Sequence, residues 1–320
     1  MNIVKNSATV IVSILFLFLF LEIVLRILGN NSRIDDFLRD EPVVYQEDNE
    51  LGWTHKQGNY TFKPWSQEGK ITNLTINPDG SRKILNQNAR GSKILFFGGS
   101  TTQGWAVDDS ETFANYFQDN KINSYVFNFG VGGYGGFQSL LLQERVTKEL
   151  ESIDHIIYGF IDHHEIRNVA AGSWLYMLTE YSSRGHINLP YASIYKNELK
   201  KNKPVNYIKL PLSEYSSLIA KVEKRIMKLK SFAREKKKFE ISKLVIEEML
   251  KNAKSNNAKF TVLFLSNSDN NLEKYKNFFN EAKINYINCQ FPKNQGVKGE
   301  GHPNEVGHKN VADCLIKNLQ

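Results

Sequence analysis

The sequence predicts an α/β fold, a three-layer α/β/α sandwich built on a parallel sheet. From residue 93 onward, short and nearly continuous apolar runs alternate with helical patterns. Strands that are apolar on both faces are typical of parallel sheets covered by helices on both sides. Right-handed crossovers between the strands then place helices on the two faces. The expected strands lie at 93–99 (KILFFGG), 124–130 (SYVFNFG), 155–160 (HIIYGF), 259–266 (KFTVLFLS) and 284–289 (INYINC).

The helices between these strands are predicted from apolar residues spaced three and four apart. They lie at 111–118, 137–150, 213–254 (a pair), 271–282 and 304–319. We expect residues 91–320 to form the main domain, in which 169–258 comprise an insertion and basic helices. The Tyr- and Ser-rich part of that insertion, 169–212, is predicted to be irregular.

Residues 1–29 are predicted to be an N-terminal membrane anchor. Between Ala8 and Leu28 the chain is apolar except for Ser, Thr, Glu22 and Arg26. As a helix this stretch is about 31 Å long, enough to cross the hydrocarbon core of a bilayer. No small-residue cleavage site follows it, which favours a retained anchor over a cleaved signal peptide. The arginines that follow the span do not support an outward-facing domain by the positive-inside rule.

Residues 30–90 are expected to be a linker and a small β-rich segment ahead of the main domain. The run ITNLTIN at 71–77 alternates apolar and polar residues, and NPDG at 77–80 is a turn signal.

The positive charge of the chain is concentrated in one segment. Residues 195–258 hold 17 Lys and Arg against 7 Asp and Glu, whereas the whole chain carries a net charge of +7. We interpret these lysines as the solvated face of amphipathic helices, with an anionic membrane surface or an acidic polymer as the alternative. No groove-reading motif or aromatic platform accompanies the charge, so a nucleic-acid partner is not expected.

The two cysteines, Cys289 and Cys314, lack the spacing of a zinc or redox site. They could form one disulfide, but two small buried apolar side chains is the favoured interpretation.

Polar and glycine-rich loops follow the predicted strands on the side where ligands bind in open parallel sheets. GGSTTQG places Ser100 at a strand-to-helix turn, and the next strand is followed by the glycine-rich GVGGYGG. The third strand is followed by IDHHEIRN with His163 and His164, and the last by a loop with Glu300 and His302. A hydroxyl nucleophile, backbone amide donors and imidazoles at one edge are the groups needed for acyl transfer through a serine.

Other interpretations of these motifs are disfavoured. The G-x-x-x-x-G skeleton from Gly99 to Gly104 is followed by Trp105 and Ala106, where a phosphate loop needs Lys and Ser or Thr. The glycine run lacks the setting of a dinucleotide-binding fold. H-E-x-x-H is absent, so metal binding by the histidines is not expected.

These loop motifs resemble the characteristic sequence blocks of the SGNH (GDSL-type) hydrolase superfamily. The resemblance is to its membrane-anchored bacterial members in particular, whose first block contains GGST. The resemblance covers roughly residues 45–320. FFGGSTTQG matches the first block with Ser100 as nucleophile, NFGVGGYGG the second with Gly133 as oxyanion glycine, and GHPNEVGH the last with His302 as catalytic base. It implies the flavodoxin-like SGNH fold, preceded by one transmembrane helix and a small β-rich segment.

Two positions depart from the family pattern. The third block lacks the asparagine whose amide completes the oxyanion hole, and His163 or His164 stands nearby. An imidazole N–H can donate the same bond, and we assign this role to His163. The family's Asp before the catalytic His is replaced by Glu300, which could orient the imidazole, as could a backbone carbonyl.

The resemblance implies a serine-dependent ester hydrolase or O-acyltransferase that needs no metal or other cofactor. Ser100, His302 and Glu300 would be catalytic, and Ser100, Gly133 and His163 would form the oxyanion hole. The substrate would carry an acyl group, often acetyl, on a cell-envelope carbohydrate or lipid. The protein would be a single-pass membrane protein with its catalytic domain outside the cytoplasm. The alternative is a non-catalytic glycan-binding or assembly protein with a degraded site.

Overall fold

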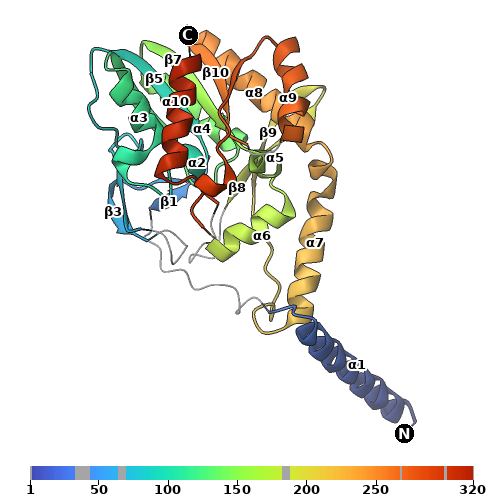
Figure 1. Cartoon of the computed structure of the whole chain (residues 1–320). Helices are drawn as coiled ribbons and strands as arrows, with labels where there is room; N and C mark the ends of the chain where they lie inside the picture. The colour runs from blue at the N-terminus through green and yellow to red at the C-terminus, as the bar shows by residue number, and fades with distance from the viewer. Residues whose placement is uncertain are drawn as a thin grey trace. The chain divides into compact units, whose positions relative to one another are not determined.

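The computed structural model describes residues 2–32, 44–63, 70–181, 188–266, 269–298 and 301–319 (Figure 1). The chain divides into two compact units. One comprises Met1–Arg39, Gly172–Ile187 and Asn206–Phe232, and the other comprises Asp40–Ala171, Asn188–Val205 and Ala233–Gln320.

The larger unit contains the predicted parallel sheet. Its five strands pair in parallel in the order β11-β10-β7-β5-β6. They are β5 (Ser92–Gly98), β6 (Ser124–Gly130), β7 (Ile153–Phe160), β10 (Lys259–Phe264) and β11 (Asn285–Asn288). This order is flavodoxin-like, and the direction in which strands are added reverses between β5 and β7. The fold class predicted from the sequence is confirmed.

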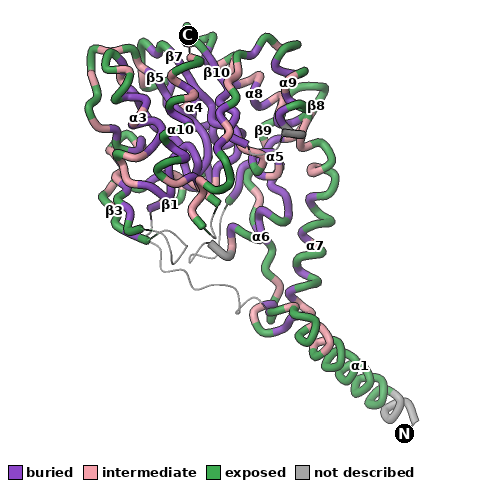
Figure 2. Tube along the Cα trace, in the orientation of Figure 1, coloured by how far each residue is buried: buried purple, intermediate pink, exposed green. Residues whose placement is uncertain are grey.

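Helices cover both faces of the sheet, and the strands between them are buried (Figure 2). On one face, Phe96, Ile157 and Leu263 pack in one apolar cluster with α3 (Phe113–Asn120) and α10 (Glu305–Asn318). Because strand side chains alternate between faces, Tyr158 points to the other side. There it approaches α4 (Gly136–Glu149), which packs on α8 (Lys238–Ser255). The same unit also contains α9 (Asp269–Glu281) and the short 3₁₀ helices η2 (Asp109–Glu111) and η3 (Lys293–Gln295).

The two cysteines form a disulfide, so the interpretation as two free apolar side chains is wrong. Cys289 directly follows β11 and Cys314 lies in α10, with their Cα atoms 5.7 Å apart. The spacing of 25 residues along the chain gave no sign of this proximity, because the return of α10 onto the sheet edge creates it. The bridge joins the last helix to the last strand.

Short two-stranded antiparallel sheets are present in addition to the parallel sheet. The predicted β-rich segment contains β1 (Tyr45–Asp48) paired with β2 (Gly52–His55), and β3 (Gly58–Phe62) paired with β4 (Thr72–Ile76).

The segment 169–212 is more regular than predicted. It contains α6 (Gly172–Tyr181) and a hairpin of β8 (Leu189–Tyr195) and β9 (Glu198–Val205). The hairpin turn is Lys196-Asn197 with φ of 50° and 64°, and two successive positive φ values match the twist of paired strands. A lysine at the first turn position masked this signal in the sequence.

The smaller unit contains α1 (Asn2–Ile27) and most of α7 (Ser217–Glu235). Ser7–Ile27 of α1 is long and apolar enough to cross a membrane. Near its end, the Glu22 carboxylate accepts hydrogen bonds from the backbone N–H groups of Ser217 (2.9 Å) and Leu218 (3.0 Å). These are the first amides of α7, where a negative charge also complements the helix dipole. Glu22 therefore has a structural partner on α7, in addition to its ion pair with Arg26 (2.7 Å).

We expect the stability of the protein to fall steeply below pH 6.5. Burial lowers the pKa of His55 and His155 to about 4 and that of His308 to about 3. A histidine in the unfolded chain has a pKa of about 6.5. As the pH falls from 6.5 toward 4, the unfolded chain therefore binds more protons than the folded one. Each histidine then removes up to about 1.4 kcal/mol of unfolding free energy per pH unit.

Urea denaturation at pH 7.5, 6.5, 5.5 and 4.5 measures this effect. His155→Gln should flatten the pH dependence, since it removes one of the buried imidazoles whose pKa is lowered. A urea midpoint that stays constant from pH 7.5 to 4.5 would contradict the prediction.

Candidate active site

Three glycines near the ends of neighbouring strands have no side chains, and α2 (Ser100–Gln103) packs closely against them. Gly98 is in register with Gly130 on one side and with Gly159 on the other. A Cβ at Gly98 or Gly159 would lie 2.2 Å from Thr102 Oγ1, and one at Gly130 would lie 2.4 Å from the backbone nitrogen of Gln103. Any larger residue would displace the helix that begins with Ser100. The glycines were visible in the sequence, but their shared register was not.

Ser100 is the first residue of α2 and is buried, with 9% of its surface exposed. The far end of this short helix is held by Arg82, a fully buried residue. Its guanidinium donates to the carbonyl oxygen of Gln103 (2.9 Å) and also to that of Gly104. Asp109 balances its charge at 3.0 Å. Arg82 lies in the segment that we predicted as a β-rich preface, and nothing in its sequence neighbourhood indicated this role.

The structure brings His302 to Ser100 across 202 residues of chain, with His302 Nε2 2.7 Å from Ser100 Oγ. The backbone around His302 is fixed on both sides. Its carbonyl accepts from the Val297 N–H at 2.7 Å, and Gly301 before it adopts a φ of +83° that only glycine takes readily. Behind it, the Asn304 side chain caps α10 through the Gly307 N–H (3.0 Å). The predicted acid, Glu300, lies outside the described residues.

Gly133, the predicted oxyanion glycine, lies in the loop between β6 and α4 with a φ of +80°. Among the described residues, no hydrogen-bond acceptor is found for its backbone N–H. The amide is thus available to a ligand.

The histidines after β7 point in different directions because they begin a helix, α5 (His163–Asn168). His163 is exposed. Desolvation of part of its ring lowers its pKa, and the charges of Arg167 and His302 add to this. His164 is fully buried, with its Nδ1 2.6 Å from the Tyr158 hydroxyl, and burial lowers its pKa well below the usual range. Both rings are neutral at pH 7, and of the two only His163 is open to a ligand.

The rest of α5 holds the glycine loop. Arg167 Nη1 donates to the carbonyl oxygen of Tyr134 (3.0 Å), and Asn168 Oδ1 accepts from the N–H of Phe137 (2.8 Å). Both residues stand in the polar IDHHEIRN motif, which the sequence singled out without assigning them a role.

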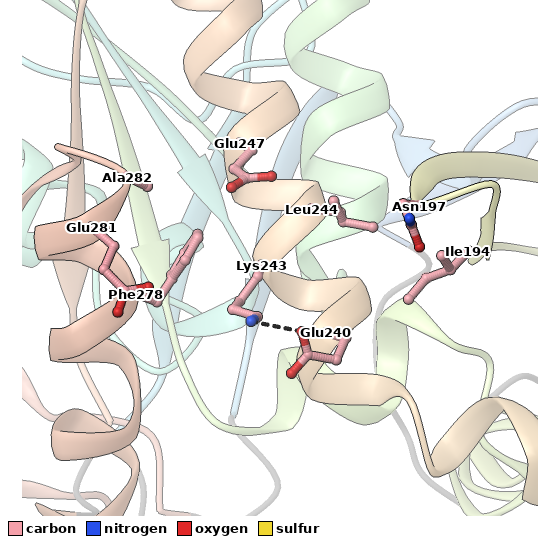
Figure 3. Close-up of a pocket in the computed structure, with 9 residues that line it drawn as sticks. All are labelled: Ile194, Asn197, Glu240, Lys243, Leu244, Glu247, Phe278, Glu281 and Ala282. Atoms are coloured by element: carbon pink, nitrogen blue, oxygen red, sulfur yellow. Dashed lines mark ion pairs between the residues drawn. The ribbon is translucent and has the colours of Figure 1, made fainter.

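A cavity of about 510 Å³ lies apart from these residues, between α8, α9 and the β8–β9 turn (Figure 3). Its charged lining includes Glu240 and Lys243, which pair with each other at 2.6 Å. None of the predicted site residues lines it. In the part of the chain that the structure describes, no group of three or more His, Cys, Asp and Glu is arranged to hold a metal ion.

The fold and this site define an α/β protein with a serine–histidine pair at the carboxyl edge of its parallel sheet. No family model and no curated protein matches the sequence.

Solved structures of GDSL-type proteins are similar to the chain at low sequence identity. A lipolytic protein of the G-D-S-L family from Veillonella parvula DSM 2008 is 12% identical, with 72% of this chain and 98% of that one covered and a TM-score of 0.40. TesA is 13% identical over 72% and 98%, with a TM-score of 0.41. A G-D-S-L family protein from Desulfitobacterium hafniense DCB-2 is 13% identical over 72% and 100%, with a TM-score of 0.39. The side chains of the site decide the chemistry.

Proposed function

We propose that the protein is a serine-dependent ester hydrolase or O-acyltransferase. The observation that carries this proposal is the 2.7 Å contact between Ser100 Oγ and His302 Nε2 at the carboxyl edge of the sheet. A hydroxyl within hydrogen-bond reach of an imidazole is the arrangement that nucleophilic catalysis requires.

In the proposed reaction, Ser100 Oγ attacks the ester carbonyl carbon while His302 Nε2 takes the hydroxyl proton. The tetrahedral intermediate then collapses, the alkoxide leaves, and His302 returns the proton to it. Water or a sugar hydroxyl next attacks the acyl-serine while His302 takes its proton. The bond between Ser100 Oγ and the acyl carbon then breaks, His302 returns the proton to Ser100 Oγ, and the acyl group departs as an acid or a new ester. We assign to Glu300 the orientation of the imidazole.

The negative charge that develops on the carbonyl oxygen needs donors fixed in advance. We assign this role to the N–H groups of Ser100 and Gly133 and to the imidazole of His163. Support comes from the availability of the Gly133 amide and from the exposed, neutral ring of His163 beside His302. Each such donor typically lowers the barrier by about 3 kcal/mol.

We propose an acylated cell-envelope carbohydrate or lipid as the substrate, and a single-pass anchor formed by α1 with the catalytic domain outside the cytoplasm. The apolar span of α1 supports the anchor. The disulfide between Cys289 and Cys314 supports the location of the catalytic domain in an oxidising compartment.

A fluorophosphonate probe tests the reaction class directly. It should label the wild-type protein covalently at Ser100, as located by mass spectrometry of the digested protein, and hydrolysis of an acetyl ester should stop as labelling proceeds. Binding of envelope glycans without labelling would instead favour a non-catalytic glycan-binding protein.

The assignment of His163 predicts a specific pattern of kinetic losses. His163→Ala should lower kcat about a hundredfold with little change in KM, because the bond to the oxyanion forms mainly in the transition state. His163→Asn should keep most of the activity, since an amide N–H can donate in its place. Steady-state kinetics on a small acetyl ester measures both values.

His164→Ala is the comparison for this pair. It removes a buried ring packed on Tyr158 and should lower the melting temperature, whereas His163→Ala should not. Equal and small losses of kcat at both positions would withdraw the assignment of His163.

A further inference from the structure

We infer that Trp53, on the hairpin β1–β2 that precedes the sheet, is a positioning residue for the oxyanion hole. The inference rests on the proposed function of Gly133. The indole Nε1–H of Trp53 donates to the carbonyl oxygen of Gly132 at 3.0 Å. Trp53 is 8% exposed, so water competes little for this bond.

The bond acts on the peptide unit that carries the proposed donor. The carbonyl of Gly132 and the N–H of Gly133 belong to one planar trans peptide, in which the two groups point in opposite directions. A donor fixed on the carbonyl side therefore fixes the direction of the N–H on the other side. It also polarises the peptide, because hydrogen bonds in series strengthen one another. Trp53 thus sets both the direction of the Gly133 N–H and its strength as a hydrogen-bond donor.

This peptide would otherwise rotate easily, because it joins two glycines. Gly133 has a φ of +80°, and side chains that would restrict the loop are absent at both positions. The space beside Gly132 is filled instead by the hairpin: a Cβ there would lie 2.0 Å from the Tyr45 hydroxyl. The next residue, Tyr134, packs edge-on against the Trp53 ring with centroids 5.6 Å apart, and its hydroxyl donates to the Trp53 carbonyl.

The same hairpin also holds the helix that begins with the nucleophile. The Gln103 side chain of α2 lies 2.8 Å from His55 Nε2 and accepts from the Tyr45 hydroxyl at 3.2 Å. Because His55 is neutral at pH 7, its Nε2 can accept from the Gln103 amide while its Nδ1–H donates to the Gly80 carbonyl (2.8 Å). One hairpin therefore contacts both the nucleophile helix and the oxyanion loop.

Trp53→Phe removes the indole donor and keeps an aromatic ring against Tyr134. The matched control is Arg145→Gln, which removes an ion pair that docks the same hairpin on α4 through Asp48 (2.6 Å) without touching Gly132. We expect Trp53→Phe to lower kcat about tenfold on an acetyl ester with KM nearly unchanged. The reason is that a misdirected Gly133 N–H weakens a hydrogen bond that forms mainly in the transition state. Arg145→Gln should leave kcat unchanged and lower only the melting temperature.

A second measurement does not depend on activity. In full-length protein labelled with ¹⁵N-glycine, Trp53→Phe should shift the amide resonance of Gly133 and speed its hydrogen exchange, and Arg145→Gln should do neither. Equal losses of kcat in the two variants, or an unchanged Gly133 amide in Trp53→Phe, would overturn the inference. If the wild-type protein shows no labelling at Ser100 while the Gly133 amide still responds to Trp53→Phe, the proposed function fails and the positioning role of Trp53 stands.

Discussion

Ser100→Ala is expected to lower kcat for hydrolysis of a small acetyl ester by about four orders of magnitude or more, because the nucleophile and its base act as a unit. For the same reason, His302→Ala should cost about as much, and the double variant little more than either single one. The melting temperature should hardly change, since Ser100 loses only one hydroxyl group. Kinetics and thermal denaturation of the three variants measure both effects.

Ser231→Ala is a suitable control for this experiment. It also removes a buried serine hydroxyl from a helix, where Ser231 Oγ donates to the Met227 carbonyl at 3.0 Å. It should therefore affect stability and not kcat. A Ser100→Ala variant that kept more than about a tenth of the wild-type rate would show that another group is the nucleophile.

The second large effect concerns stability. Replacing Cys289 and Cys314 together by serine should lower the free energy of unfolding by about 3 kcal/mol, because the bridge closes a loop of 25 residues in the unfolded chain. The bridge also ties α10 to the sheet, and the N-terminus of α10 immediately follows the His302 loop. Loss of activity on heating should therefore begin at a lower temperature. Urea denaturation and residual-activity curves measure the two effects.

A reducing agent provides an independent check on the disulfide. The chain has only these two cysteines, so dithiothreitol can act on no other disulfide within it. Reduced wild-type protein should match the double serine variant, and the variant itself should not respond to the reagent. Identical urea midpoints for oxidised and reduced wild-type protein would show that the bridge does not stabilise the fold.

The sequence by itself determined the sheet and the loops at its edge. Strands such as 93–99 and 155–160 are apolar at nearly every position, and this local pattern is enough to predict burial on both faces. Ser100 was predicted to be the nucleophile because it directly follows such a strand. His302 was predicted to be the base because it precedes the start of a helix in a motif, GHPNEVGH, that resembles the last SGNH block. The roles of Glu300 and His163 stay predictions, since each stands where the family pattern is broken.

Only the tertiary structure decided which residues meet. The pairing of Ser100 with His302, the bridge between Cys289 and Cys314, and the contacts of Arg82 and Trp53 with the site all join segments far apart in the chain. Such contacts cannot be predicted from hydrophobic periodicity. Periodicity indicates which side of a helix or strand is buried, but not which distant group packs against it. A tryptophan in a short alternating strand therefore looks like any other core residue until the fold places its indole N–H on the carbonyl of Gly132.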